Sequence, residues 1–530
     1  MQFLPLLCAA VMCLTAYNFV NFLQLNNYAV FRSAINYAEK QAIELLFAAG
    51  LSAAALITNI FIENEVFFIV GLLVFLAGFT AGIKARNKKR LKSAKTPLVY
   101  TKRVVRLYAF IFFFNTAVFY GAYFFYGIAA YSVFVYVVFA FYAADYCLAC
   151  SIINIFESLN NRRYIKKAAK KLDSYKSLIR IGITGSYGKT SVKNILKEML
   201  GKKFNVVATE KNYNTPLGIV RTLDKIDGDT EIFIAEMGAK RRGEIAELCD
   251  MVKPDIGIIT GITAQHMETF KSLGNVAATK SELYYAVKDG ACIFNTDDCH
   301  IRELDIINRP NAIKSGSAEG LDCIAENIKT DADGSAFTLR FNIKKLYRGG
   351  AAERSREVHI KTHLIGRANV TNITTAAAAA FFLGISAEDI KAAAEALEPV
   401  HNRAEIIKNG GITVIDDTYN SNPVGAKAAL ETLSMFDGRR IVVACGFAEQ
   451  SKYLAEANGK FGRDIARIAD MAVLVGSGAK HIADGMEKEG FDMKKVYSYA
   501  SLNQAKVDFS KLFMNGDVIL FENDMPDNLE

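Results

Sequence analysis

The stretch RIGITGSYGKTSVKNILKEML, residues Arg180–Leu200, decides the fold. An apolar run typical of a buried strand leads into a glycine-rich loop, and an amphipathic helix follows. This arrangement turns backbone N–H groups and a helix N-terminus toward an anion, and Lys189 and Thr190 can add contacts to phosphates and Mg²⁺. The common phosphate loop, G-x-x-x-x-G-K-[ST], would need a glycine where this chain has Ile183. The glycine stands at Gly185 instead, so the loop is shorter than the common form.

The composition divides the chain into an apolar first third and a more polar remainder. Its 530 residues are enough for several domains, and the apolar excess lies before residue 160. The net charge of +8 comes with Lys/Arg clusters beside apolar runs, which favours a membrane surface over nucleic acid as a partner. Of the nine cysteines, Cys147 and Cys150 form a C-x-x-C inside an apolar run without a second pair, which argues against zinc. The rest are typical of reduced thiols in a cytosolic protein.

Five apolar segments are long enough to cross a bilayer, which takes roughly 20 residues each. They are approximately Phe3–Leu25, Ile43–Ile62, Val66–Ile83, Val104–Tyr126 and Ile128–Phe156, the last of which can continue as an interfacial helix. The first lacks the basic start and the cleavage site of a signal peptide, so we expect it to remain as an anchor. No pair of ionisable residues within the segments indicates transport; Asp145 comes nearest and stands alone.

Two basic loops predict the orientation of these segments. KARNKKRLKSAK, Lys84–Lys95, separates the third segment from the fourth, and NNRRYIKKAAKK, Asn160–Lys171, follows the fifth. Placing both in the cytosol puts the N-terminus outside and everything after Asn160 inside, where ATP is available. We therefore expect a multi-pass protein of the cell membrane with cytoplasmic catalytic domains. The segments either serve only as an anchor or also handle a substrate.

Polar side chains follow later strands at their carboxyl ends, where parallel α/β sheets bind ligands. EIFIAEMGA ends a strand at Glu236, and PDIGIITGITAQHMETF places His266 in the loop after another strand. GACIFNTDD ends a third strand at Asn295 and continues through Asp297 and Asp298. Glu236 and His266 could therefore meet the phosphates and a metal. Taken alone, each is equally compatible with a structural role.

Alternating strand and helix signals predict two α/β domains after the membrane part. We expect a helical membrane domain at residues 1–160, a central phosphate-loop ATPase-like domain at 172–399, and a C-terminal Rossmann-like domain with a parallel sheet at 400–530. A hairpin region from AFTLRFNIKKL through REVHIKTHLIG is inserted in the central domain, and NVTNITTAAAAAFFLG forms an Ala-rich helix. The active cleft is expected between the two α/β domains, so that their closure gates the reaction.

Several motifs resemble one enzyme family. The short loop TGSYGKT is similar to that of the Mur ligases and the folylpolyglutamate synthetases. TEKNYNTPLGIVRTL (Thr209–Leu223), AEMGA, TGITAQHMETFKSLGNVAATKSEL and VIDDTYNSNP resemble the Mur ligase branch that adds D-alanyl-D-alanine to UDP-N-acetylmuramoyl-tripeptide. They stand in the family's order over about Ser177–Gly478.

The resemblance implies an ATP and Mg²⁺ site and names its residues. The implied catalytic residues are Lys189, Glu236, His266, Lys280 and Arg403. The implied metal ligands are Thr190, Glu236, His266 and Lys280. The implied nucleotide contacts are Gly185, Ser186, Tyr187, Gly188, Lys189, Thr190, Ser191, Asn295, Asp298, Asn369, Arg403 and Asp417, whose loop continues through Tyr419, Asn420 and Asn422. Lys280, in ATKSEL, falls where the family carries a lysine carbamylated by CO₂, which would turn a cation into an oxygen donor. The sequence alone would favour a solvated surface lysine at this position.

The chain departs from the family pattern in three places. Five membrane segments stand where the family has a soluble domain that holds the UDP-sugar. Ala368 replaces the histidine of a G-x-H-N motif, while Asn369 remains. The last residues, with Asn523, Asp524 and Asp527, are acidic where the branch has a Lys-Gly-Ser-rich loop that helps to hold the amine. The dipeptide substrate is therefore less firmly predicted than the reaction type.

The resemblance implies ATP-dependent amide formation on a muropeptide-like or lipid-linked cell-envelope precursor. The expected partners are nucleotide, envelope-precursor substrates and membrane lipid, without nucleic acid; protein partners are not predicted. Two alternatives stay open. A poly-γ-glutamate-type synthetase would also be membrane-tethered with a short phosphate loop, although VIDDTYNSNP argues against it. The second alternative is a non-catalytic nucleotide-binding partner of an envelope enzyme. The presence of all five implied catalytic residues argues against it, because such a partner would not need to keep them. The sequence contains no ABC-type signature that would indicate an ATP-driven transporter.

Overall fold

The computed structural model describes residues 2–26, 28–61, 65–91, 98–126, 128–347, 349, 356–399, 403–419, 422–447 and 454–522. The predicted acidic end (Asn523, Asp524 and Asp527), Asn420 and part of the basic loop Lys84–Lys95 lie outside these ranges. The chain forms two compact units, one built on Met1–Arg162 and the other on Arg163–Met525.

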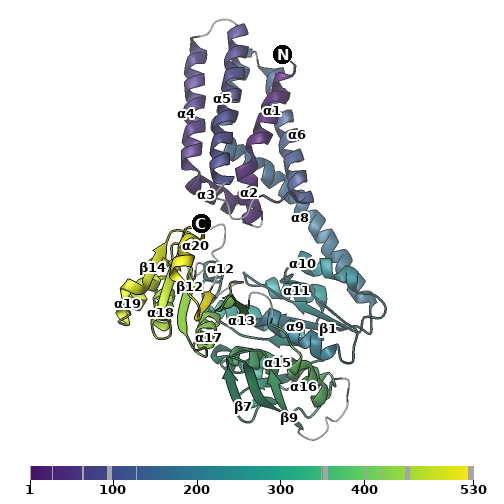
Figure 1. Cartoon of the computed structure of the whole chain (residues 1–530). Coiled ribbons are helices and arrows are strands. Elements are labelled where there is room, and N and C mark those ends of the chain that lie inside the picture. Colours follow the sequence, from purple (N-terminus) through teal and green to yellow (C-terminus); the bar gives the residue numbers. More distant parts are fainter. Residues whose placement is uncertain are drawn as a thin grey trace. The chain divides into compact units, whose positions relative to one another are not determined.

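The first unit is helical (Figure 1). Its helices are α1 (Leu4–Thr15), α2 (Tyr17–Leu25), α3 (Val30–Lys40), α4 (Ala42–Ile60), α5 (Glu65–Leu91), α6 (Lys102–Phe125), α7 (Ile128–Ala140) and α8 (Tyr142–Ser174), of which α8 continues into the second unit. Among the described residues, α4, α5 and α6 are long and apolar enough to cross a membrane, and the number rises to five if each of two bent pairs forms one span.

Two of the five predicted spans are bent in the structure. The predicted span Phe3–Leu25 is broken between α1 and α2 by a bend of 44°, and the span Ile128–Phe156 is broken between α7 and α8 by 79°. At the first break, the Thr15 hydroxyl donates to the carbonyl of Val11 at 2.9 Å, a side-chain bond that competes with the helix ladder and bends helices. As predicted, the last apolar segment runs on, since α8 ends only at Ser174.

A buried carboxylate in the first unit was not singled out from the sequence. Glu44 lies inside the predicted span Ile43–Ile62 and is 1% exposed. It accepts hydrogen bonds from the hydroxyl of Tyr142 at 2.8 Å and the amide of Asn18 at 3.2 Å, and from Tyr37. Asp145, which the sequence did single out, accepts from the amide of Asn115 at 3.0 Å. In these contacts, the donors to Glu44 and Asp145 are uncharged groups.

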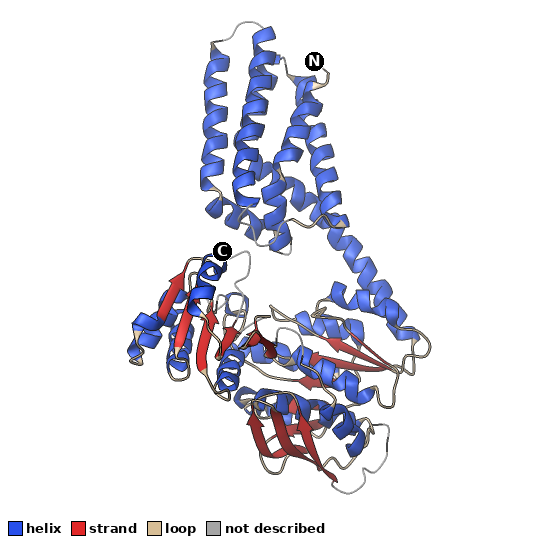
Figure 2. Ribbon diagram, viewed as in Figure 1, coloured by secondary structure: helices blue, strands red, loops and turns tan. Residues whose placement is uncertain are grey.

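The second unit contains a nine-stranded sheet in the order β2-β3-β1-β4-β5-β6-β7-β8-β9. Figure 2 draws the strands of this unit in red and its helices in blue. Its strands are β1 (Ile179–Thr184), β2 (Val206–Ala208), β3 (Ile232–Glu236), β4 (Ile256–Ile259), β5 (Cys292–Asn295), β6 (Ala312–Gly316), β7 (Cys323–Asp331), β8 (Gly334–Phe341) and β9 (Arg356–Thr362). The pairs from β2 to β7 are parallel, and β7-β8 and β8-β9 are antiparallel. The predicted inserted hairpin is thus β8 and β9, extended by β7.

Helices fill the chain between these strands. They are α9 (Lys189–Leu200), α10 (Pro216–Thr222), α11 (Glu244–Val252), α12 (Met267–Phe270), α13 (Leu273–Ala286), α14 (Cys299–Arg302), α15 (Arg367–Phe382) and α16 (Ala387–Glu395). Two separate apolar clusters pack against the sheet, one with α9, α15 and α16 and the other with α10, α11 and α13. The predicted Ala-rich helix is α15, and its alanines from Ala376 to Ala380 are fully buried because small side chains permit close packing against β5 to β8.

A second sheet of six strands follows in the order β10-β11-β15-β12-β13-β14. Its strands are β10 (Glu405–Asn409), β11 (Ile412–Asp417), β12 (Arg439–Ala444), β13 (Met471–Val475), β14 (Val496–Tyr499) and β15 (Asp517–Glu522). The helices between them are α17 (Pro423–Leu433), α18 (Leu454–Ala466), α19 (Ala479–Lys488) and α20 (Leu502–Leu512). Except for the antiparallel pair β10-β11, the sheet is parallel, as predicted.

Candidate active site

The phosphate loop has the predicted strand–loop–helix form, between β1 and α9. Gly188 is the N-cap of α9 with a φ of +76°, a conformation that favours glycine. A Cβ at Gly188 would stand 2.8 Å from the side-chain oxygen of Asn372, and one at Gly185 would stand 2.1 Å from the hydroxyl of Thr260. Gly188 is therefore required mainly by its backbone conformation and Gly185 by close approach, and the first turn of α9 presents its N–H groups at the end of the loop.

The loop is fastened to the segment that follows β4. The backbone N–H of Ser186 donates to the carbonyl of Gly261 at 2.7 Å, and the N–H of Thr263 donates to the Ser186 hydroxyl at 3.1 Å. Lys189 donates from Nζ to the carbonyl of Gly185 at 2.7 Å, so its ammonium is folded onto the loop. A phosphate-bearing ligand would draw this ammonium away from that carbonyl.

Glu236 ends β3, the neighbour of β1, and collects donors from three elements. Its Oε2 accepts from the hydroxyl of Thr190 at 3.0 Å and from Nζ of Lys193 at 3.0 Å. Its Oε1 accepts from the side-chain amide of Asn214 at 3.2 Å. Both Lys193 and Glu236 side chains are 1% exposed, so they form a buried ion pair. The structure thus joins the predicted pair Thr190 and Glu236.

Two lysines act directly on this carboxylate, and two further cations, Lys280 and Arg403, interact with Lys189. Burial raises the pKa of Glu236, but Lys193 and Lys189 outweigh that effect and hold the pKa below its ordinary value. Burial lowers the pKa of Lys189 to about 8; Glu236 acts to raise it, and the charge of Arg403 lowers it further. Burial also lowers the pKa of Lys280, to about 7, and the charge of Lys189 adds to the shift. Buried cations beside a phosphate loop suit a polyanion such as a triphosphate.

The two remaining predicted ligands lie on the elements after β4. Lys280 is on α13 and is only 3% exposed, so the structure rules out the solvated surface lysine that the sequence alone favoured. His266 is the N-cap of α12 and has a left-handed backbone with a φ of +53°, which is uncommon for residues other than glycine. The contacts of Glu236 described above do not include His266, whose ligand role stays a prediction.

The oxygen donors fit Mg²⁺ in kind. A threonine hydroxyl and a carboxylate are ligands that Mg²⁺ takes, and it usually keeps several waters or phosphate oxygens besides. The two donors, Thr190 Oγ1 and Glu236 Oε2, lie 3.0 Å apart. No group of three or more His, Cys, Asp and Glu side chains suited to a metal occurs within the described part of the chain.

Asn295 and Asp298 connect β5 with the loop after β4. The side-chain amide of Asn295 donates to the carbonyl of Thr260 at 2.8 Å. Asp298 accepts from the N–H of Ile262 at 2.9 Å and from the hydroxyl of Tyr187 at 2.5 Å. These two predicted nucleotide residues thus border the phosphate loop, and in this structure their side chains bond to protein groups.

The residues predicted after position 400 approach the phosphate loop. Arg403 donates from Nη2 to the hydroxyl of Thr190 at 3.3 Å, and its guanidinium lies 4.5 Å from the ring centre of Tyr419. Asp417 ends β11 and accepts from the N–H of Ala404 at 3.2 Å. Burial raises the pKa of Asp417, although the charge of Arg403 acts to lower it.

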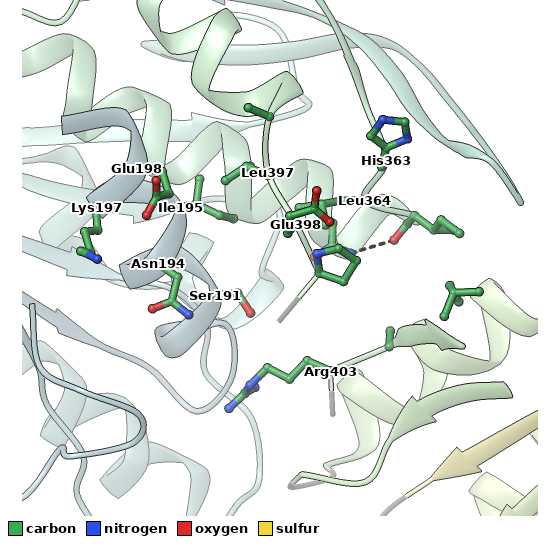
Figure 3. A pocket seen from close by; sticks show the side chains of 16 residues that line it. Ser191, Asn194, Ile195, Lys197, Glu198, His363, Leu364, Leu397, Glu398 and Arg403 are labelled. Carbon is green, nitrogen blue, oxygen red and sulfur yellow. Dashed lines mark hydrogen bonds between the residues drawn. The ribbon is translucent and has the colours of Figure 1, made fainter. Parts of the chain in front are cut away.

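A cavity of about 400 Å³ opens beside this point. Its lining includes Ser191 and Asn194 on α9, Asn369 on α15, and Arg403. Arg403 extends toward the helix that carries Ser191 and Asn194 (Figure 3). The volume lies in the range of small-molecule sites. The side-chain amide nitrogen of Asn369 donates to the carbonyl of Ile365 at 2.9 Å.

Two residues at the centre of the site were missed from the sequence. The sequence indicated only that Lys193 is a polar position of an amphipathic helix and that Asn214 belongs to a substrate-side loop. Lys193 stands four residues after Lys189, one helical turn along the same face of α9. That spacing could have identified Lys193, because it places a second cation on the helix face from which Lys189 would contact a phosphate.

Family models match both α/β parts of the chain. The Mur ligase middle domain matches residues 183–380, and the Mur ligase glutamate ligase domain matches residues 402–522. Two curated relatives carry the name UDP-N-acetylmuramoyl-tripeptide–D-alanyl-D-alanine ligase. The protein from Bacillus subtilis is 27% identical over 351 residues, which are 64% of this chain and 72% of the relative. The protein from Mycobacterium bovis is 32% identical over 259 residues, 48% of each chain, so the match spans about half of that relative.

Solved structures share the fold. MurF from Acinetobacter baumannii has a TM-score of 0.61 at 24% identity, with 69% of this chain and 78% of that chain covered. MurF from Thermotoga maritima, solved in complex with ADP, has a TM-score of 0.59 at 23% identity and covers 70% and 82%.

Proposed function

The chain belongs to the Mur ligase family through its middle and C-terminal domains, and from this premise we propose that it is a membrane-anchored peptide ligase of the cell envelope. It is an ATP-dependent carbon–nitrogen ligase that uses Mg²⁺. The observation that carries the proposal is the placement of Lys189, Lys193 and Arg403 beside Thr190 and Glu236 at the start of α9. Such a cluster favours a bound triphosphate over a neutral ligand.

The reaction is amide formation through an acyl phosphate. A carboxylate oxygen of the acyl substrate attacks the γ-phosphorus of ATP, the bond to the β-bridging oxygen breaks, and ADP leaves. The nitrogen of the amine substrate then attacks the acyl carbon, phosphate leaves with the bond electrons, and the amine nitrogen loses a proton. No serine or cysteine nucleophile takes part.

The obstacle to the first step is the repulsion between a carboxylate and a triphosphate. Lys189 would move from the carbonyl of Gly185 to the phosphates, and Arg403 would face them from the other side of the hydroxyl of Thr190. Fixed positive groups aimed at developing charge stabilise a transition state without reorganising. Mg²⁺, held by Thr190 and Glu236 with phosphate oxygens, would supply further charge neutralisation.

Lys280 is suited to carbamylation. A neutral amine is the form that reacts with CO₂, and the lowered pKa of Lys280, about 7, keeps much of the amine neutral at cytoplasmic pH. The product carbamate is an anion, which the neighbouring Lys189 would stabilise rather than repel. We propose that this carbamate and His266 complete the ligands of a metal.

The helical unit is proposed to hold the enzyme at the cell membrane, with the α/β domains in the cytoplasm. Three apolar helices of spanning length, and two bent pairs, support this placement. The cluster of Arg162, Arg163, Lys166 and Lys167 on α8 follows the last apolar segment, as cytoplasmic flanks do. The acyl substrate is proposed to be a muropeptide-like or lipid-linked envelope precursor, and the amine a D-alanyl-D-alanine-like dipeptide.

The test is phosphate release from ATP by the full-length protein in detergent. UDP-N-acetylmuramoyl-tripeptide with D-alanyl-D-alanine is the first pair, followed by lipid-linked equivalents. Release should require both substrates and should be lost in Lys189→Ala, while Lys202→Ala, an exposed lysine just after α9, should keep it. Bound ATP without turnover for any pair would contradict the ligase and leave a nucleotide-binding partner.

A further inference from the structure

We propose that Tyr187 is a positioning residue that braces the phosphate loop against the turn after β5 and thereby sets the affinity for ATP. The inference rests on the proposed nucleotide site and concerns how this chain holds its loop in shape. Its basis is a contact between the hydroxyl of Tyr187 and Asp298, together with the packing of the Tyr187 ring on Gly261.

The hydroxyl of Tyr187 makes a strong, charge-assisted contact. It donates to Oδ2 of Asp298 at 2.5 Å. Burial raises the pKa of Tyr187 well above its ordinary value, and the adjacent Asp298 raises it further, so the phenol keeps its proton and remains the donor. A hydrogen bond to a carboxylate is shorter and stronger than one between neutral groups.

Asp298 is itself fixed, so the contact ties the loop to a rigid point. Its Oδ1 accepts from the N–H of Ile301 at 2.8 Å and caps α14. Its Oδ2 also accepts from the N–H of Ile262 at 2.9 Å. The carboxylate therefore links three segments: the phosphate loop, the segment after β4 and the start of α14.

The ring of Tyr187 leaves space for no side chain beneath it. A Cβ built on Gly261 would stand 2.3, 2.5 and 2.7 Å from three atoms of that ring, which are its three nearest neighbours. The carbonyl of Tyr187 also accepts from the hydroxyl of Thr260, next to Gly261. The segment Thr260–Gly261 thus contacts both the ring and the backbone carbonyl of Tyr187.

This double hold matters because the loop acts through its backbone. N–H groups bind phosphates only when they converge, and misplacement by about 1 Å can cost on the order of 10²-fold in rate. Tyr187 lies between Ser186 and Gly188, so its side chain can fix the orientation of the peptide groups on either side. The effect should appear in ATP binding rather than in the stability of the sheet.

The first experiment measures ATP and ADP affinity by calorimetry on the full-length protein in detergent, with KM for ATP and kcat where turnover is found. Tyr187→Phe keeps the ring and removes the donor, and it should weaken nucleotide binding by about tenfold, the effect of a lost hydrogen bond to a charged group. The matched control is Tyr175→Phe, at the opposite end of β1, where the lost hydroxyl donates to the carbonyl of Ile226 at 3.1 Å. The control should bind ATP as the wild type does.

A second pair of variants separates bracing from a general loss of stability. Gly261→Ala should weaken ATP binding while Tyr187 is present, because the new methyl group displaces the ring. In a Tyr187→Ser background, the same Gly261→Ala change should cost less than twofold. Additive effects of the two changes, or Tyr187→Phe binding ATP within twofold of wild type, would overturn the inference. Absence of ATP binding by the wild type would overturn the proposed function together with it.

Discussion

Replacing Lys193 by methionine should destabilise the site, because it leaves Glu236 without its closest cation. The two side chains are 1% exposed and their charged atoms are 3.0 Å apart. Removal of one partner of a buried ion pair costs about 3–5 kcal/mol, since the other charge stays buried and uncompensated. Thr190 and Asn214 still donate to Glu236, so the lower end, about 3 kcal/mol, is expected.

Hydrogen–deuterium exchange of the full-length protein measures this effect locally. A loss of about 3 kcal/mol corresponds to roughly 10²-fold faster exchange for amides of β1 and β3 that open with the site. Lys197→Met, on the exposed face of the same helix, should leave exchange unchanged. Adding Glu236→Gln to Lys193→Met should restore much of the protection, because the buried carboxylate that had lost its partner is then neutral. The reasoning is refuted if β3 exchanges at the wild-type rate in Lys193→Met, or if the double variant is no better protected than the single one.

Three further predictions concern Arg403 and Lys280. Arg403→Ala should lower kcat by roughly 10²-fold, as loss of a charge-stabilising donor does. A single-turnover rate constant within threefold of the wild-type value would contradict the role given to its contact with Thr190. Bicarbonate added to CO₂-depleted protein should restore activity more at pH 8 than at pH 6, because the pKa of Lys280 is about 7 and only its neutral amine reacts; equal rates with and without bicarbonate would exclude a carbamate. For the unmodified protein, the unfolded state keeps the ordinary Lys280 pKa of 10.5 and so binds more protons than the folded state between pH 7 and 10.5. The free energy of unfolding should therefore rise with pH across that window, less steeply in Lys280→Met, and an identical slope in both proteins would contradict the lowered pKa.

The sequence predicted the α/β elements well because each one carries its own local signal. The short loop between β1 and α9 is marked by Gly185 and Gly188, and the structure supplies the close contact that requires the first and the backbone conformation that requires the second. Glu236 was found because it ends an apolar run, and the carboxyl ends of parallel strands meet at one edge. The parallel order of the second sheet follows from its alternating strands and helices.

What the sequence did not predict depends on contacts between distant residues. The spacing from Lys189 places Lys193 on the same face of α9, but it does not identify the partner, Glu236, which is 43 residues away. The contact between Arg403 and Thr190 spans 213 residues, and Arg403 was suggested only by family resemblance. The burial of Lys280 likewise depends on packing, so the interpretation of Lys280 as a solvated surface lysine was wrong.

The membrane part shows a different limit. Hydropathy reports length and composition, and both are unchanged by a bend, so the breaks next to Thr15 and at Phe141 were invisible. The cluster of Glu44 with Tyr37 and Tyr142 was missed for a related reason, because one carboxylate does not alter the mean of an apolar segment.

The central claim, amide formation through an acyl phosphate, is tested most directly by following oxygen. The carboxylate substrate that supports turnover is labelled with ¹⁸O in its reacting carboxyl group and incubated with ATP, Mg²⁺, the amine and the full-length protein. Released phosphate should carry one ¹⁸O atom from that carboxyl group for each amide formed, and Lys189→Ala should release none. Phosphate that carries no carboxyl oxygen would mean that water, and not the carboxylate, attacks ATP, and would contradict the ligase mechanism.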